Sequence, residues 1–162
     1  MEITFQKRIS EEQKALINKF IVFCSSCLFK QEEIDQLKIH VKVNKTLQDA
    51  ALCSAYIDCD NSFILTIAQW IFTSLPEKDS EWYLFETIAH EFAHIWQYYH
   101  KLLSIEDYGA IYRGKHYGTS VYNSPYISDI IELPWETEAF TIQNILKDLW
   151  LFNKEPSFIW RT

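Results

Sequence analysis

The stretch HEFAHIWQYYH occupies residues 90–100 and holds three of the chain's five histidines. His90 and His94 are four residues apart, so on a helix their imidazoles lie on one face and can reach a single ion. At about 100° per residue, the carboxylate of Glu91 falls beside that ion, where it can accept a proton from water. The stretch therefore predicts a helix that carries a metal site, with Glu91 as its general base.

The helix around this stretch is expected to begin at Ser80, a capping residue after the break at residues 76–79, and to reach about Leu103. Its apolar side chains fall nearly opposite the histidines, so one face can pack on a sheet while the histidines face a cleft. These side chains are Trp82, Phe85, Ala89, Phe92 and Trp96. The alternative is a solvent-exposed polar helix face that contains the two histidines by coincidence. The HExxH pattern arises by chance in roughly one such chain in a hundred.

The segments before this helix predict one further helix and about three strands. Residues 10–29 begin with a capping residue and two acids and continue with apolar residues at helical spacing. Residues 37–43 alternate apolar and polar side chains, whereas residues 52–58 and 62–72 are rich in β-branched and aromatic ones. We expect a small, mostly antiparallel sheet with a tight turn at residues 59–62.

The segments after the helix predict a loop and a last helix. Residues 104–131 contain all three glycines and more than half of the nine tyrosines, which suggests an irregular aromatic loop. A final helix is expected from Pro134, a favoured first-turn residue. Its core-facing positions are Trp135, Ala139, Ile142, Leu146, Leu149 and Trp150. The fold class is thus α+β, with one domain over residues 1–162.

The composition excludes several classes of protein. The net charge of −7 disfavours a nucleic-acid partner, since phosphate binding needs a basic surface. The most apolar early stretch, residues 16–29, is shorter than the roughly 20 residues that span a bilayer, so no membrane association is expected. The N-terminal residues lack the basic-then-apolar order and the small-residue cleavage site of a secretory signal. We therefore expect the protein to reside in the cytoplasm.

The four cysteines allow two disulfides or a four-thiolate zinc site. Cys24 and Cys27 form a CxxC pair, but Cys53 and Cys59 are six residues apart, farther than a zinc knuckle usually requires. Free cysteine packs as a small hydrophobe. We therefore expect four buried, reduced thiols.

The motif HEFAH followed by PWETEAF at residues 134–140 resembles the gluzincin branch of the zincin metallopeptidases. In its minimal members, such as the ImmA/IrrE-type and CAAX-prenyl-type peptidases, a helix after HExxH carries an ExxA motif whose glutamate binds zinc. The resemblance covers about residues 10–152 and implies a zincin-like fold. It also implies Zn²⁺ as the metal and Glu136 as its third ligand, beside His90 and His94.

The chain departs from this family at one informative position. Phe140 stands where relatives carry an acid or amide that orients a ligand histidine, so that partner must come from elsewhere. The helical projection itself does not choose between Glu136 and Glu138, because both flank the apolar stripe. Glu138 and Glu132 therefore remain alternatives to Glu136 as the ligand.

His100 offers a competing third ligand, because its spacing matches the metzincin pattern HExxHxxGxxH. That pattern uses glycine to end the helix and return the histidine to the ion, whereas Gln97 is a good helix former. Metzincins also have a methionine beneath the metal, and the only methionine here is Met1. We therefore expect that His100 is not a ligand.

The motif and the resemblance together predict a zinc-dependent peptidase that acts on polypeptides, with Glu91 moving the proton from water to the leaving amine. A donor for the developing oxyanion is also needed. By resemblance, the strand at residues 63–67 would present its edge to an extended peptide. Candidate oxyanion donors are Tyr108, Tyr112, Arg113, His116, Tyr117 and Tyr122.

The alternative function is a non-catalytic metal-binding or interaction module, which has no chemical need for Glu91.

Overall fold

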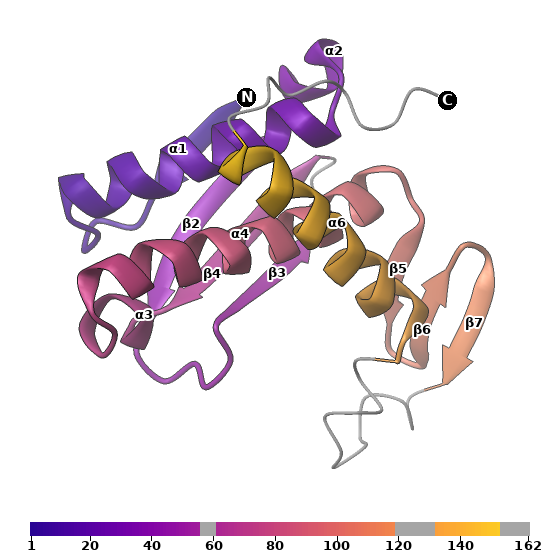
Figure 1. Ribbon diagram of the computed structural model, residues 1–162. Coiled ribbons are helices and arrows are strands. Elements are labelled where there is room, and N and C mark those ends of the chain that lie inside the picture. Colours follow the sequence, from indigo (N-terminus) through magenta and orange to yellow (C-terminus); the bar gives the residue numbers. More distant parts are fainter. Residues whose placement is uncertain (56–60, 119–131, 153–162) are drawn as a thin grey trace.

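The computed structural model describes residues 1–55, 61–118 and 132–152, and within them the chain forms five helices and two sheets (Figure 1). The predicted α+β class is confirmed. The first part contains β1 (Glu2–Phe5), α1 (Glu11–Leu28), α2 (Gln31–Ile34), β2 (Lys38–Asn44), β3 (Ala51–Ala55), β4 (Ser62–Ala68) and α3 (Trp70–Thr73). The second part contains α4 (Glu77–Tyr99), β5 (Leu103–Glu106), β6 (Gly109–Tyr112), β7 (Lys115–Gly118) and α6 (Pro134–Leu151).

The larger sheet has four strands in the order β1-β2-β4-β3 and is mixed. Both β1 with β2 and β2 with β4 are parallel, and only β3 with β4 is antiparallel. The prediction of three mostly antiparallel strands was therefore wrong. Alternation of apolar and polar residues is the same in both strand directions, so it could not show that neighbouring strands are parallel. In the structure, α1 forms the long crossover that connects the parallel strands β1 and β2. Residues 59 and 60, the first half of the predicted turn, are outside the described ranges.

Three helices cover one side of this sheet (Figure 1). The first, α1, begins as predicted with a capping box between Ser10 and Gln13. Its Phe20 lies 5.2 Å from Phe85 of α4 and 5.3 Å from Trp150 of α6, measured between ring centroids. This aromatic cluster joins all three helices in one core. No helix in the described residues is long and apolar enough to cross a membrane.

The helix α4 is longer at its start and shorter at its end than the sequence predicts. It begins at Glu77 after Pro76, and the hydroxyl of Ser80 donates to the carbonyl of Ile71 instead of capping the helix. It ends at Tyr99 because Lys101 adopts a left-handed conformation, with φ of 55°. The bonds from Lys101 N to Tyr98 O and from Leu102 N to Gln97 O complete a Schellman motif.

The second sheet corrects the prediction of an irregular loop at residues 104–131. Strands β5, β6 and β7 form an antiparallel sheet over residues 103–118, and residues 119–131 lie outside the described ranges. The turn between β6 and β7 has positive φ at Arg113 (48°) and Gly114 (77°), as a type I′ hairpin requires. Each strand has only four residues, too few for a clear alternation in the sequence.

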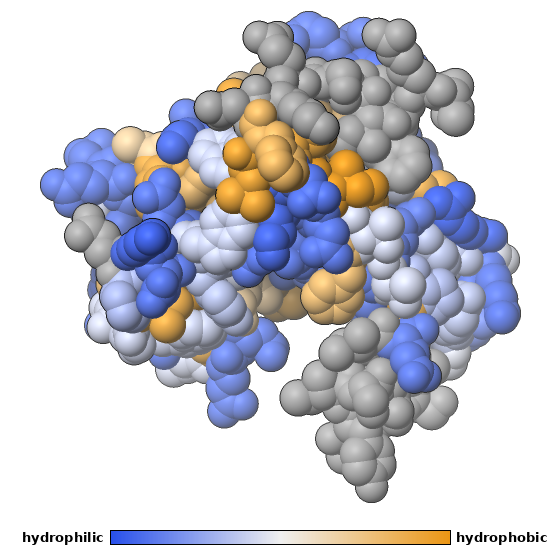
Figure 2. All heavy atoms as spheres, in the orientation of Figure 1, coloured by the Kyte–Doolittle hydropathy of each residue, from blue (hydrophilic) through white to orange (hydrophobic). Residues whose placement is uncertain are grey.

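The last helix, α6, begins at Pro134 as predicted and crosses over α4 (Figure 1). Its buried positions are Trp135, Ala139, Ile142 and Leu146, which confirms the predicted core face. Near its start, Trp135 packs with Tyr112 and Leu133 in a small cluster beneath the second sheet. Figure 2 shows hydrophobic side chains gathered near the other end of α6, where Leu151 and Phe152 are exposed.

The cysteines follow the prediction as far as the structure describes them. Cys24, Cys27 and Cys53 are free and buried, and Cys59 lies outside the described residues. Burial raises the pKa of the Cys24 thiol well above its ordinary value and that of Cys27 to about 11. These thiols are protonated and packed as apolar side chains.

Candidate metal centre

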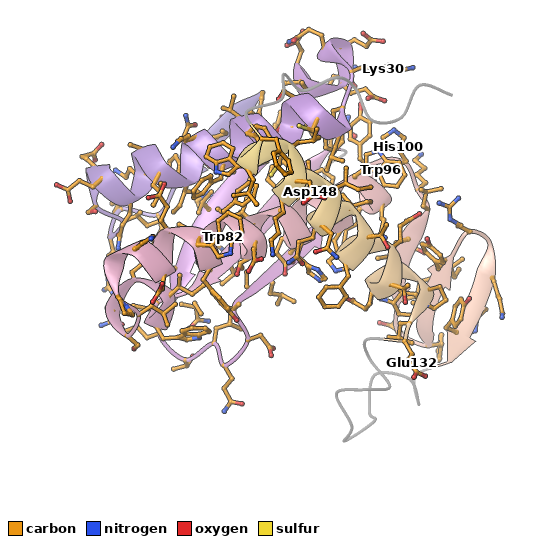
Figure 3. The ribbon with its side chains drawn as sticks, viewed as in Figure 1. Lys30, Trp82, Trp96, His100, Glu132 and Asp148 are labelled. Carbon is orange, nitrogen blue, oxygen red and sulfur yellow. The ribbon has the colours of Figure 1, made fainter. Side chains whose placement is uncertain are left out.

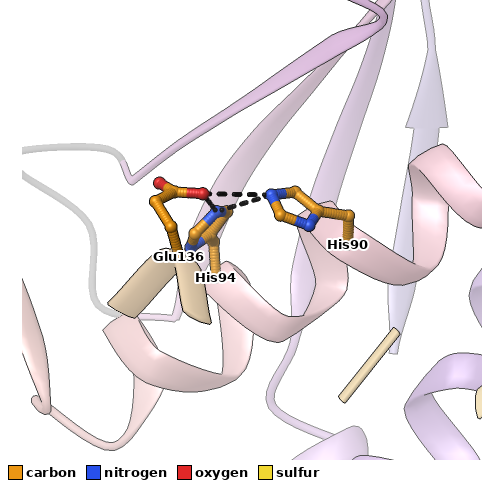
Figure 4. Close-up of side chains that lie close together, drawn as sticks. All are labelled: His90, His94 and Glu136. Atoms are coloured by element: carbon orange, nitrogen blue, oxygen red, sulfur yellow. Dashed lines mark hydrogen bonds and ion pairs between the residues drawn. The ribbon is translucent and has the colours of Figure 1, made fainter. Parts of the chain in front are cut away.

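The side chains of His90 and His94 on α4 and of Glu136 on α6 converge on one point (Figure 4). The two histidine Nε2 atoms are 3.2 Å apart. Oε2 of Glu136 lies 3.2 Å from Nε2 of His90 and 3.4 Å from Nε2 of His94. The crossing of α6 over α4 thus brings together the three residues that the motif and the resemblance single out.

These distances match the spacing of ligand atoms around a small tetrahedral cation. Zinc binds imidazole nitrogen at about 2.0–2.1 Å, which places neighbouring ligand atoms about 3.3–3.4 Å apart in a tetrahedral site. The donor set of two imidazole nitrogens and one carboxylate oxygen is also typical of zinc sites that keep one position open. The three side chains therefore could hold a metal ion.

The electrostatics of the cluster favour a positive charge. Burial opposes ionisation of Glu136, but hydrogen bonds and charges from His90 and His94 outweigh it and lower its pKa to about 2. Glu136 is thus a carboxylate at neutral pH. Burial also acts against protonation of His94, yet its contact with Glu136 raises its pKa on balance. A metal cation and protonated histidines would satisfy the same carboxylate.

Glu91 belongs to α4 and is only 8% exposed, and its side chain contacts the edge strand β3 at Cys53. Burial raises the pKa of Glu91, although the charges of His94 and His90 and a hydrogen bond with the backbone of Cys53 oppose that effect. A carboxylate that is removed from water in this way is a stronger proton acceptor than a free one. Its position beside the cluster suits a general base.

An open cleft of about 1310 Å³ gives access to the cluster. One wall is the strand β3, including Leu52 and Ser54, and the other comes from α4 and α6, including Tyr83 and Phe140. Glu91, His90, His94 and Glu136 line the same cleft. A substrate in the cleft would therefore reach the cluster and the candidate base together.

The two alternative glutamates lie elsewhere. The carboxylate of Glu138 accepts hydrogen bonds from Gln97 at 3.0 Å and from Tyr112 at 2.8 Å, and it pairs with Arg113 at 2.6 Å. Glu132 is exposed near the start of α6, at the lower edge of Figure 3. Neither belongs to the cluster that could hold a metal.

His100 also lies apart from the cluster, beyond the last turn of α4 and beside Trp96 (Figure 3). Its Nδ1 contacts the carbonyl of Trp96 at 3.0 Å, and its Nε2 pairs with Glu33 at 3.3 Å. The imidazole thus joins the end of α4 to α2. The structure gives His100 this packing role instead of bringing it to His90 and His94.

The candidate oxyanion donors do not line the cleft within the described residues. Tyr112 and Arg113 are engaged with Glu138, and Tyr117 packs on Trp135 at 5.2 Å between ring centroids. Tyr108 and His116 are exposed on the second sheet, and Tyr122 lies outside the described residues. The described tyrosines that do line the cleft are Tyr83, Tyr98 and Tyr99, whose helical positions gave no such signal in the sequence.

The side chains around the two histidines differ. Gln97, which the sequence analysis treated only as a helix former, contacts Nδ1 of His94 through its Oε1 at 2.9 Å. Nδ1 of His90 is buried without a hydrogen-bond partner among the described residues. The ring of Phe140 lies 4.5 Å from the ring of His90, measured between centroids.

Comparisons with protein-family models, with curated proteins and with solved structures find no match to this chain. The chemistry of the site is therefore argued from its own side chains. Two imidazoles and one carboxylate that could hold a metal ion lie at the wall of an open cleft, with a buried carboxylate beside them.

Proposed function

We propose that the protein is a zinc-dependent peptidase, and that its zincin resemblance reflects this activity. The observation that carries the proposal is the convergence of His90, His94 and Glu136 at the wall of the cleft, next to the buried Glu91. The three side chains would hold Zn²⁺. A purely structural site would close around its metal and would not need a buried carboxylate beside an open cleft.

The residues around the cluster can divide the work of peptide hydrolysis. Bound zinc supplies Lewis-acid chemistry, which polarises a carbonyl and lowers the pKa of water. Glu91 accepts a proton from the attacking water at its carboxylate and later donates it to the nitrogen of the leaving amine. Glu136 would hold the metal as a carboxylate, since a side chain must be deprotonated to act as a metal ligand.

The substrate class follows from the edge of the larger sheet. The expectation that residues 63–67 present an edge was wrong, because β4 pairs on both sides, with β2 and β3. The edge that borders the cleft is β3, with Leu52 55% exposed. An extended polypeptide can pair with such an edge through its backbone. We therefore propose an unfolded or extended polypeptide as the substrate.

A cleavage assay tests this proposal. The purified chain is incubated with an unstructured protein and with a broad peptide library, first with zinc and then after its removal by a chelator. Cleavage that requires zinc and returns when zinc is restored is the expected result. A chain that binds zinc but cleaves none of these substrates would instead be a non-catalytic metal-binding module.

Zinc is expected to bind with one equivalent per chain and to stabilise the fold, because the ligands meet only when α6 packs on α4. At free zinc of about 100 times Kd, binding adds about 2.7 kcal/mol to the free energy of unfolding. For a chain of this size that raises Tm by roughly 5–10 °C. Thermal melts with zinc and with chelator measure the shift. An unchanged Tm after proven zinc removal would contradict the linkage.

A further inference from the structure

We propose that Gln97 and Glu138 form a positioning relay that fixes the ring of His94 in the tautomer whose Nε2 lone pair faces Glu136 and His90. The relay gives roles to two residues outside the cluster, one of them a rejected candidate for the third ligand. Its importance for zinc rests on the proposed function, but its effect on the tautomer of His94 does not.

The side-chain amide of Gln97 has only one orientation that satisfies its surroundings. The residue is fully buried, and its Nε2 lies 2.9 Å from the carbonyl oxygen of Trp135 and 3.0 Å from Oε2 of Glu138. Both neighbours are acceptors, so the NH₂ group must face them. If the amide were inverted, its oxygen would face a carbonyl and a carboxylate, with its own hydrogens unpaired and buried.

The fixed amide determines where the proton of His94 resides. Oε1 of Gln97 lies 2.9 Å from Nδ1 of His94 and can only accept, so Nδ1 must carry the hydrogen. In the neutral ring the lone pair is then on Nε2, which lies 3.2 Å from Nε2 of His90 and 3.4 Å from Oε2 of Glu136. That is the tautomer a metal ligand requires.

The second sheet holds the far end of the relay. Tyr112 donates its hydroxyl to Oε2 of Glu138 at 2.8 Å, and Nη2 of Arg113 pairs with Oε1 at 2.6 Å. Arg113 sits at φ of 48° in the β6–β7 turn, a left-handed conformation that costs a non-glycine residue energy. The turn directs the guanidinium to Glu138, so the hairpin fixes the carboxylate that orients Gln97.

The tautomer is tested on the metal-free protein with ¹⁵N-labelled histidine at alkaline pH, where the ring is neutral. Long-range ¹H–¹⁵N spectra are expected to show His94 protonated at Nδ1 alone. Gln97→Met has a similar shape but cannot accept this hydrogen, so a mixture of tautomers is expected. Glu138→Ala, which removes one of the two acceptors of the amide, is expected to shift the tautomer ratio in the same direction.

Zinc affinity, measured by competition with a chromophoric chelator, gives the second readout. Loss of a partner that orients a ligand histidine typically weakens metal binding about 10- to 100-fold, and we expect this for Gln97→Met. Lys147→Ala is the matched control, because Lys147 makes a 2.7 Å ion pair with Glu86 that also ties α6 to α4 but contacts neither histidine. It should leave both the affinity and the tautomer unchanged.

Three outcomes test whether Gln97 and Glu138 position the ring of His94. A folded Gln97→Met variant with the wild-type tautomer and wild-type affinity overturns the relay, and if that variant does not fold, Glu138→Ala is judged by the same criteria. An equal loss of affinity in Lys147→Ala also overturns it, since the effect would then come from helix packing. A wild-type chain that binds no zinc but shows the Nδ1 tautomer supports the relay while refuting the proposed peptidase.

Discussion

The Glu91→Gln variant is expected to lose about 10²- to 10⁴-fold in kcat, because it lacks the carboxylate that accepts the proton of the attacking water. Glutamine has almost the same shape, and at 8% exposure the position tolerates little change in volume. The variant removes a charge from a buried site without touching the three candidate ligands. Zinc content and fold should therefore match the wild type.

The measurement combines single-turnover cleavage, zinc content and a thermal melt on the same sample. Glu81→Gln is a suitable control, because it makes the same chemical change on α4 at an exposed residue, near Lys19 and outside the cleft. It should retain wild-type turnover. If Glu91→Gln still cleaved at the wild-type rate, Glu91 would have no part in the reaction.

The sequence predicted the two helices of the site better than it predicted their contact. Both α4 and α6 have clear apolar periodicity, and the four buried positions of α6 were all among the predicted ones, whereas Leu149 and Trp150 are only partly buried. Periodicity could not separate Glu136 from Glu138, because both flank the same apolar stripe. What separates them in the structure is their partners, namely the histidines of α4 for Glu136 and Arg113 for Glu138.

The partners of Glu138 come from a part of the chain that the sequence analysis interpreted as a loop. Tyr112 and Arg113 are placed by β6 and by a two-residue turn, in strands too short for their alternation to be recognised. The strand β1 at the N-terminus was not predicted for the same reason, because it too has only four residues. Short strands are defined by their neighbours in space, and this information is absent from a local window.

The end of α4 shows a similar limit. The helix predicted from the sequence reaches about Leu103, and no glycine directly follows Tyr99 to mark a C-terminal cap. In the structure, Lys101 takes the left-handed position instead, and Leu102 is drawn back to the carbonyl of Gln97. The following strand, β5, then begins at Leu103 and leads into the sheet that holds Arg113.

Glu136→Ala is expected to weaken zinc binding by more than the roughly 10- to 100-fold that loss of an orienting partner costs, because it removes a ligand itself. It also removes the negative charge that favours a cation between His90 and His94. Glu136→Gln should weaken binding too, since the amide keeps the size of the side chain but not its charge. Competition with a chromophoric chelator measures the zinc affinities of both variants and of the wild type.

His100→Ala is the matched histidine change, and it should leave zinc affinity nearly unchanged. Ten residues of helix separate His90 from His100 by about 15 Å along the axis, far beyond coordination distance. The imidazole is also committed elsewhere, to Glu33 at 3.3 Å and to the carbonyl of Trp96 at 3.0 Å. Its loss should lower Tm by loosening α2 from α4. If His100→Ala lost zinc while Glu136→Ala retained it, the third ligand would be a histidine and the gluzincin interpretation would be wrong.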